Sequence, residues 1–248
     1  MRVAIIADIH GNALALDAVL ADLGRGGYDH LVCLGDAIQG GPQPALVVAR
    51  LRSLGCPTVL GNADAYLLTG AETGAEPLDD ARRRRLAATR DWSLTRLSDA
   101  DRAFIAAFPL TVELALPGDL RLRCAHGTPA SFDEILLPTT PDDELVASLA
   151  PDGRTLHVGG HTHVQFVRQF PDRTFFANPG SVGLAWRHGQ PPGIVRADPW
   201  AEYAILDVAE GRVELSFRRI PFDVAAYRAI IHASDAPHAA DLAAQYIG

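Results

Sequence analysis

The chain has 248 residues, of which 48% are hydrophobic and 21% are charged, as in an ordinary water-soluble globular protein. Its formal net charge of −8 argues against a general nucleic-acid-binding protein, because phosphate contacts normally require a basic face. No apolar run reaches the roughly 18 residues that span a bilayer, and the apolar start is too short for a signal peptide. We therefore expect one cytoplasmic domain over residues 1–248, with its three cysteines as free thiols.

The first 60 residues alternate between strand and helix patterns. Short apolar runs at 2–7, 30–34 and 57–60 predict strands. The stretches 12–23 and 44–54 have apolar residues at helical spacing and end at glycines, which predicts helices. Nearly continuous apolar strands are typical of parallel strands that are covered on both faces. The order of these elements predicts an α/β fold.

Residues 63–108 have a different pattern, which predicts a helical insert or cap. Helical spacing covers Leu78–Leu97 and Asp99–Phe108, and Ser98 is a candidate N-cap of the second helix. The first helix contains the arginine run Arg82–Arg85. Because four consecutive residues point around the whole helix, we prefer a solvated helix surface to a phosphate-binding role for these arginines.

The rest of the sequence is rich in strand patterns. Helical patterns occur at 141–149 and 223–232, and the Pro117-Gly118 and Glu210-Gly211 pairs predict tight turns. The predicted strands are 110–116, 120–125, 155–158, 164–170, 174–177, 203–208 and 213–219.

Five of the predicted strands end in residues of the kind that bind metal ions. These residues are Asp8 and His10, Asp36, Asn62, His126, and His161 and His163. In open α/β sheets, ligands bind beyond the carboxyl ends of the strands, so we expect these side chains to meet at one edge. Two carboxylates, four imidazoles and one amide oxygen suit two divalent cations, with manganese preferred and iron, zinc, cobalt or nickel as alternatives.

A pair of cations about 3.5–4 Å apart can activate water as hydroxide and direct it to a phosphate ester. Each motif alone is weak evidence, because a histidine at the end of a strand is more often a hydrogen-bonded structural residue. Five such motifs in this order are much harder to explain in that way. No serine or cysteine nucleophile stands among them, so we expect no covalent enzyme intermediate.

These motifs resemble the signature of the calcineurin-like metallophosphoesterase superfamily. The segment 178–183 is also similar to one in its small bacterial and archaeal phosphodiesterase branch. The resemblance covers about residues 1–220 and is specific for the superfamily rather than for a substrate. The motifs are Asp8-Ile9-His10-Gly11-Asn12, Gly35-Asp36, Gly61-Asn62, His126-Gly127 and Gly160-His161-Thr162-His163.

The resemblance implies a fold of two packed mixed β-sheets with helices outside. It implies a phosphodiesterase in which hydroxide bridged between two divalent metals hydrolyses the ester, with Asp36, Asn62 and His10 in catalytic roles. It also implies how the ligands divide, which the residues alone leave open. The first metal would be held by Asp8, His10 and His163, the second by Asn62, His126 and His161, and Asp36 would bridge them.

One position departs from the superfamily pattern. Much of the superfamily has a histidine after the asparagine that assists the leaving group, whereas here Ala63 and Asp64 follow Asn62. Alanine cannot donate a proton, and general-acid help is typically worth about 10²–10⁴-fold. We therefore expect good leaving groups, such as aryl or nucleoside-phosphate oxygens, or a proton from water or another residue. Asp64 could supply it only with a strongly raised pKa.

Two further residues are candidates for substrate binding. Asn12 could orient a phosphate oxygen or cap the first helix, and Arg187 could contact phosphate or simply lie on the surface. The expected partner is a small phosphoester, rather than nucleic acid or a membrane, and the sequence does not give the oligomeric state. Two other functions stay open: a non-catalytic scaffold or regulatory module, which Ala63 supports, and a nuclease, which the negative net charge disfavours.

Overall fold

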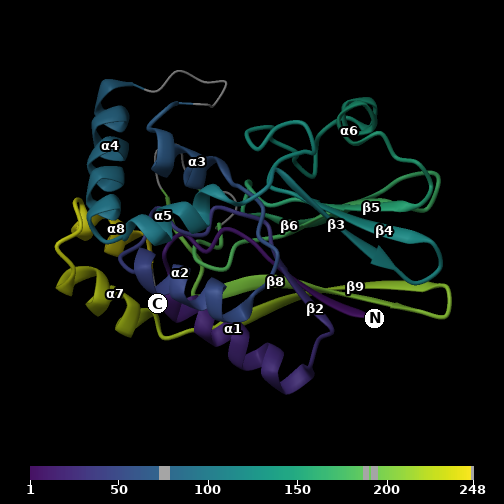
Figure 1. The fold of residues 1–248 in the computed structure, drawn as a ribbon, viewed down its shortest axis with the longest axis horizontal. Helices are drawn as coiled ribbons and strands as arrows, with labels where there is room; N and C mark the ends of the chain where they lie inside the picture. The colour runs from purple at the N-terminus through teal and green to yellow at the C-terminus, as the bar shows by residue number, and fades with distance from the viewer. Residues whose placement is uncertain (73–78, 187–189, 191–194, 247–248) are drawn as a thin grey trace.

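Two β-sheets are stacked on each other, with helices on the outside of both, in the computed structural model of the protein (Figure 1). The structure describes residues 1–72, 79–186, 190 and 195–246. The strand order is β2-β1-β8-β9 in the four-stranded sheet and β3-β4-β5-β7-β6 in the five-stranded sheet. The predicted α/β fold of two mixed sheets flanked by helices is confirmed.

The four-stranded sheet contains both the start and a late part of the chain. Its central strand β1 (Arg2–Ile6) pairs in parallel with β2 (His30–Cys33) and in antiparallel with β8 (Trp200–Ala209). β9 (Arg212–Pro221) completes the sheet and is joined to β8 by a turn at Glu210-Gly211. Both turn residues have positive φ, as the predicted tight hairpin requires.

The five-stranded sheet is parallel in its centre. β4, β5 and β7 run parallel to one another, and β3 and β6 are antiparallel strands at its two edges. The carboxyl ends of β4 and β5 therefore lie at the same edge. The strands are β3 (Thr111–Leu116), β4 (Leu120–Ala125), β5 (Thr155–Val158), β6 (Gln165–Gln169) and β7 (Phe175–Pro179).

Helices cover the outer faces of both sheets. α1 (Ala13–Gly26) and α2 (Pro44–Leu54) lie on the four-stranded sheet, and α6 (Asp142–Leu149) lies on the five-stranded sheet (Figure 1). Among the described helices, none combines the length and the apolar character needed to cross a membrane. The helices at one end of the sheets are α3 (Asn62–Thr69), α4 (Asp80–Thr95), α5 (Asp99–Ala106), α7 (Val224–Ala233) and α8 (Ala239–Gln245).

Two layers of apolar side chains fix β1 in place. Val3 and Ile5 pack between the two sheets, whereas Ala4 and Ile6 pack beneath α1 and α2, and all four are completely buried. Alternate residues of a strand point to opposite faces, so burial on both faces explains the continuous apolar run in the sequence. The packing also fixes the point at which the chain leaves β1, directly before Asp8.

The strand predicted at residues 57–60 is wrong. Thr58 forms a single bridge with Cys33 in β2, and no regular strand follows. The chain turns away at Leu60, whose N–H donates to the carbonyl of Pro109 instead of extending the sheet. Because the bridge runs parallel to β2, Asn62 still reaches the edge where β1 and β2 end.

The helices predicted at Leu78–Leu97 and Asp99–Phe108 correspond to α4 and α5. The helix α3 was not predicted, and residues 73–78 lie outside the described part of the chain. Ser98 caps α5 in a capping box, as predicted. In the arginine run of α4, Arg83 pairs with two carboxylates and Arg85 pairs with Asp241. These two arginines therefore form ion pairs at the protein surface. The division of the chain into one domain with an insert stays a prediction.

His157 on β5 is a buried histidine without a hydrogen-bond partner. The residue is 1% exposed, and neither ring nitrogen has a partner among the described residues. Arg123 and Phe176 lie beside it on the neighbouring strands. Burial and the positive charge of Arg123 lower the pKa of His157 to about 4. The ring is therefore neutral in the folded protein at neutral pH.

We expect His157 to make the fold sensitive to acid. In the unfolded chain a histidine titrates near pH 6.5, so between about pH 6.5 and pH 4 the unfolded state binds a proton that the folded state rejects. The contribution of neutral His157 to the free energy of unfolding is full above the unfolded pKa. It is lost as the pH falls towards 4, and the loss is up to about 3 kcal/mol. Urea unfolding at about pH 7 and pH 4.5 should show a smaller loss for His157→Leu than for the wild type.

His30→Gln is the matched control, because His30 is exposed at the start of β2. This variant should lose as much stability in acid as the wild type. Equal losses in all three proteins would show that His157 is not the acid-sensitive group.

Candidate metal centre

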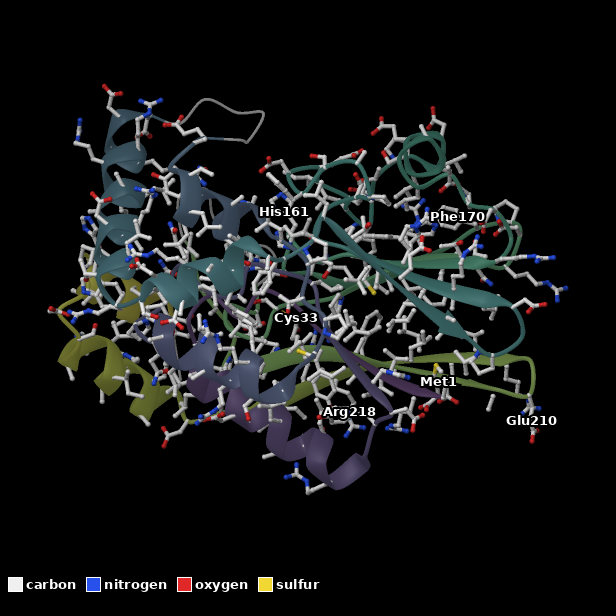
Figure 2. All side chains as sticks on the ribbon, viewed as in Figure 1. Met1, Cys33, His161, Phe170, Glu210 and Arg218 are labelled. Atoms are coloured by element: carbon white, nitrogen blue, oxygen red, sulfur yellow. The ribbon has the colours of Figure 1, made fainter. Side chains whose placement is uncertain are left out.

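The seven predicted ligands lie together where the strands of both sheets end. Figure 2 shows His161 between the helices and the sheets, far from Met1 at the opposite end of β1. Asn62 is the first residue of α3, and the other six follow strands. These six are Asp8 and His10 after β1, Asp36 after β2, His126 after β4, and His161 and His163 after β5.

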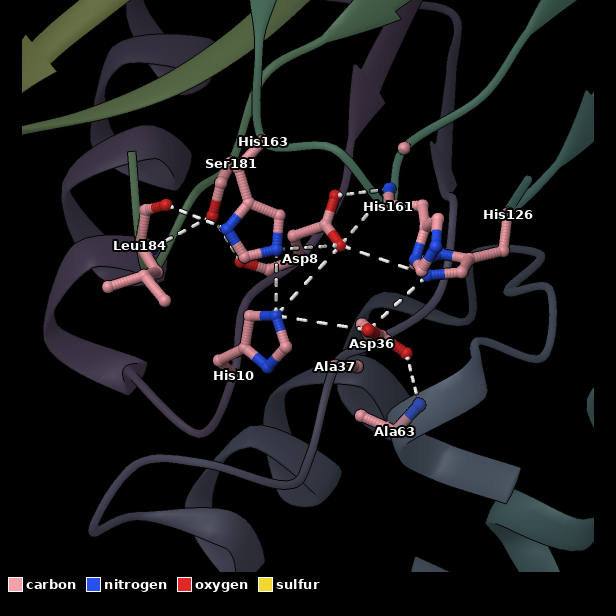
Figure 3. A network of polar contacts seen from close by, with 12 residues as sticks. Asp8, His10, Asp36, Ala37, Ala63, His126, His161, His163, Ser181 and Leu184 are labelled. Atoms are coloured by element: carbon pink, nitrogen blue, oxygen red, sulfur yellow. Dashed lines mark hydrogen bonds and ion pairs between the residues drawn. The ribbon is translucent and has the colours of Figure 1, made fainter. Parts of the chain in front are cut away.

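Six of these residues form two groups, each with one carboxylate and two imidazoles. Within each group, one ligand atom from each residue lies within 4.8 Å of the others. In Figure 3 the two carboxylates lie between the two pairs of histidines. The first group is Asp8, His10 and His163, and the second group is Asp36, His126 and His161.

Asp36 belongs to the second group and also approaches the first. Its Oδ2 is 3.9 Å from Nε2 of His10 and 3.3 Å from Nε2 of His126. Its Oδ1 accepts a hydrogen bond from the N–H of Ala63 at 2.7 Å, where the N-terminus of α3 favours negative charge. The amide oxygen of Asn62 lies 3.0 Å from Nε2 of His126 and adds a further possible metal-ligand atom beside the second group.

Backbone carbonyls orient three of the four histidines. Because a carbonyl can only accept, the Nδ1 atom of each ring carries a proton, and Nε2 is the nitrogen that faces the centre, with a lone pair whenever the ring is neutral. This orientation through the outer ring nitrogen is typical of histidines that bind metals. The Nδ1···O distances are 2.8 Å for His10 with Gln39, 2.7 Å for His126 with Leu34, and 2.9 Å for His163 with Leu184.

The donor atoms repel one another. The Nε2 atoms of His10 and His163 are only 3.1 Å apart, so two neutral rings would place two lone pairs face to face. Asp8 and Asp36 are 0% and 3% exposed, and among the described residues neither forms an ion pair with an arginine. Buried carboxylates and lone pairs at such distances require protons or a cation.

The pKa shifts reflect the same crowding. Burial alone would lower the pKa of His126, but the charge of Asp36 and their hydrogen bond raise it to about 10. Burial would raise the pKa of Asp36, but the charge of His126 lowers it well below its usual range. Burial and the neighbouring His163 lower the pKa of His10. A proton on His126 thus provides part of the positive charge that the two groups need.

The ligand-bearing loops have an unusual backbone. Left-handed conformations cost a non-glycine residue roughly 1 kcal/mol or more, and they persist only where the surroundings impose them. Here the loops after β1 and β2 hold each other, since the N–H of His10 donates to the carbonyl of Asp36 at 2.9 Å. Positive φ angles between 47° and 69° occur in Asp8, His10, Asp36, His161 and His163.

The segment after β7 supports the first group. Ser181 Oγ and the N–H of Gly183 both donate to the carbonyl of Asp8, at 2.7 and 3.0 Å. Leu184 supplies the carbonyl that orients His163. The only sequence feature that pointed to these contacts was the resemblance of segment 178–183, which ends directly before Leu184.

Asn12 acts within the protein. It is completely buried, its Oδ1 accepts from the N–H of Ala15 at the start of α1, and its Nδ2 donates to the carbonyl of Gly183. Because both ends of the amide are occupied, we interpret Asn12 as a capping and positioning residue. The other predicted substrate contact, Arg187, lies outside the described residues.

Asp64 is a supporting residue that the sequence did not reveal. It is completely buried, and its carboxylate accepts the N–H groups of Ala37 and Ile38 at 3.1 and 3.0 Å, directly after Asp36. Burial and the nearby Asp36 raise its pKa to about 7, as a general acid would require. Its burial and its two bonds instead indicate that it holds the loop that carries Asp36. The feature that could have suggested a structural role for Asp64 is its position in the first turn of α3.

Comparisons with known proteins give the family of the chain. The family model described as a calcineurin-like phosphoesterase superfamily domain matches residues 1–209. The uncharacterized protein MJ0912 of Methanocaldococcus jannaschii is 30% identical in an alignment that covers 92% of this chain and 91% of that protein.

Two solved structures show the same fold. A metallophosphoesterase from Sphaerobacter thermophilus is 24% identical, with a TM-score of 0.71 over 99% of this chain and 97% of that one. The hypothetical protein PH1004 from Pyrococcus horikoshii OT3 is 20% identical, with a TM-score of 0.77 over 98% of this chain and 96% of that one.

We expect Asp64→Ala to destabilise the protein by about 2–4 kcal/mol, because two buried N–H groups lose their acceptors. Asp64→Asn keeps one acceptor oxygen and should lose about half as much. The free energy of unfolding in urea, measured with a chelator present, tests this without any contribution from metals.

Asp91→Asn, at an exposed position of α4, controls for the general effect of removing a carboxylate and should change stability by less than about 0.5 kcal/mol. An Asp64→Ala variant as stable as the wild type would refute the role of this carboxylate in holding the loop.

Proposed function

Since the chain belongs to the calcineurin-like phosphoesterase superfamily, we propose that it is a metal-dependent phosphoric ester hydrolase with two divalent cations at the edge of its sheets. The observation that carries this proposal is the 3.1 Å distance between Nε2 of His10 and Nε2 of His163, beside buried carboxylates. A cation bound there would turn this repulsion into coordination.

The residues present fit such cations. All candidate donors are imidazole nitrogens or carboxylate and amide oxygens, which suit manganese, iron, zinc, cobalt or nickel, and we propose manganese first. The position of Asp36 between the groups supports a bridging role. In this proposal Asp8, His10 and His163 hold one cation, and Asn62, His126 and His161 hold the other.

The cations would lower the pKa of a bound water and offset the charge of the substrate phosphate. The protein's own groups would position the reaction. Asp36 and His10 approach each other where the two groups meet, and Asn62 lies beside His126. These three are the residues we propose in contact with the reacting phosphate. The N-terminus of α3 adds a dipole that favours a phosphate anion. The methyl group of Ala63 cannot protonate a leaving oxygen, which favours esters whose leaving group needs little assistance.

A direct attack by water is favoured over a covalent intermediate. Ser181, a hydroxyl close to the first group, uses its Oγ as a donor to the backbone of Asp8 and is therefore not presented as a nucleophile. The resemblance of segment 178–183 to the phosphodiesterase branch supports a diester substrate. The formal net charge of −8 supports a small phosphoester over nucleic acid.

Hydrolysis of bis-p-nitrophenyl phosphate with and without manganese tests the proposal. The wild type should turn over this diester only with metal, and Asp36→Asn should reduce the rate by about 100-fold or more, because the bridging charge is lost. Asp119→Asn is the control, since Asp119 is an exposed turn residue with positive φ, which asparagine tolerates. A folded, metal-loaded wild type without turnover above the metal blank would count against a hydrolase.

Metal binding has a readout that does not depend on turnover. A ligand present at about 100 times its dissociation constant stabilises the folded state by about 2.7 kcal/mol. Manganese should therefore raise the melting temperature of the wild type by about 5–10 °C over the chelated protein. The shift should shrink in His126→Gln and persist in Asp119→Asn. Equal melting temperatures for the wild type with manganese and with chelator would remove the basis for a metal centre.

A further inference from the structure

Trp186 is an exposed aromatic residue beside the metal centre. It is 37% exposed, and its ring meets that of His163 edge to face, with the centroids 6.3 Å apart and an angle of 77° between the planes. Nε2 of His163 faces Asp8 at 3.4 Å and His10 at 3.1 Å. The indole therefore lies directly against one member of the first group.

The backbone of Trp186 is fixed by contacts with a later part of the chain. Trp186 pairs with Ala197 in an antiparallel bridge, and Ala197 pairs in turn with Tyr246. The carbonyl of Ala185 accepts the N–H of Asp198 at 2.9 Å. These contacts fix the backbone at Trp186, although the residue is 37% exposed.

The other two tryptophans have partners that Trp186 lacks. The indole N–H of Trp92 donates to Asp235 and that of Trp200 donates to Glu202, and each ring is also covered by an arginine. Among the described residues, the indole N–H of Trp186 has no hydrogen bond and its ring has no covering cation. A large, partly exposed ring without such partners is well suited to stacking on a flat ligand.

We propose that Trp186 stacks on a planar aromatic group of the substrate, so that the enzyme prefers nucleoside phosphoesters to alkyl phosphoesters. The proposal rests on the proposed phosphoesterase function. A phosphate held at the first group brings its substituents next to His163 and the indole beyond it. Stacking tolerates different bases, because every base has a π-face. Trp186 would therefore select nucleoside phosphoesters as a class, without a preference for one base.

Two diesters with the same leaving group isolate this contact. The probes are the p-nitrophenyl ester of thymidine 5′-monophosphate and methyl p-nitrophenyl phosphate. In both, hydrolysis breaks the bond from phosphorus to the p-nitrophenyl oxygen and forms one from phosphorus to the oxygen of water. Only the retained group differs, so the ratio of the two kcat/KM values reports recognition of the nucleoside.

We expect the wild type with manganese to prefer the thymidine ester by roughly 10-fold. Trp186→Ala should reduce this ratio to near one, mainly through a higher KM for the thymidine ester, and Trp186→Phe should retain most of it, since phenylalanine also stacks. Trp92→Ala is the control, because Trp92 lies on the outer helix α4 with its own partners, and should keep the ratio of the wild type.

The outcomes separate the two proposals. If the wild type turns over neither ester with metal, the phosphoesterase proposal fails and the role of Trp186 fails with it. If it turns over both, but Trp186→Ala lowers both rates equally or leaves the ratio unchanged, only the stacking proposal fails. An equal manganese-induced rise in melting temperature in Trp186→Ala and the wild type would exclude damage to the metal centre as the cause of a lost preference.

A binding measurement adds a test that needs no turnover. The protein has three tryptophans, so a variant with Trp92→Phe and Trp200→Phe keeps Trp186 as its single indole. Adding thymidine 5′-monophosphate with manganese should quench this fluorescence, whereas methyl phosphate should not. Quenching of equal size by both, or by neither, would contradict the stacking of Trp186 on the base.

Discussion

Mutual repulsion among donor atoms is the constraint around which this protein is built. Two buried carboxylates and four imidazoles point at one small volume, and two of the imidazole nitrogens stand 3.1 Å apart. Buried polar atoms normally face partners of opposite character, whereas here two imidazole nitrogens face each other and two carboxylates are buried without an ion pair to an arginine among the described residues. The two sheets, their connecting loops and the carbonyls that orient the rings hold the donors in this unfavourable arrangement, which only positive charge relieves.

The restraints come from parts of the chain that are far apart in sequence. Asp64 in α3 holds the loop after Asp36, and the segment around Ser181 holds the loop after β1. Tyr246 donates from near the end of the described chain to the carbonyl of Gly183, although the family model ends at residue 209. The centre therefore depends on hydrogen bonds that close long loops, and it can form only when both sheets are complete.

The fold and the candidate ligand residues could be predicted from the sequence because both depend on local patterns. Apolar runs that end in Asp8, Asp36 or His126 indicate both the strand and the edge it reaches. The strand at 57–60 was overestimated, because nothing local shows that Leu60 bonds to Pro109 instead of to the sheet. The role of Asp64 also escaped prediction, since its partners lie 26 and 27 positions away, and such pairs arise only from tertiary packing.

The left-handed backbone at five ligand positions also limits how such a centre can diverge. A β-branched residue is strongly disfavoured at positive φ, whereas asparagine, aspartate and glycine are tolerated there. Asp8 or His10 could thus be exchanged for asparagine with the loop intact, but not readily for threonine or valine. Substitution at these candidate ligand positions is therefore confined to the few side chains that the main chain permits.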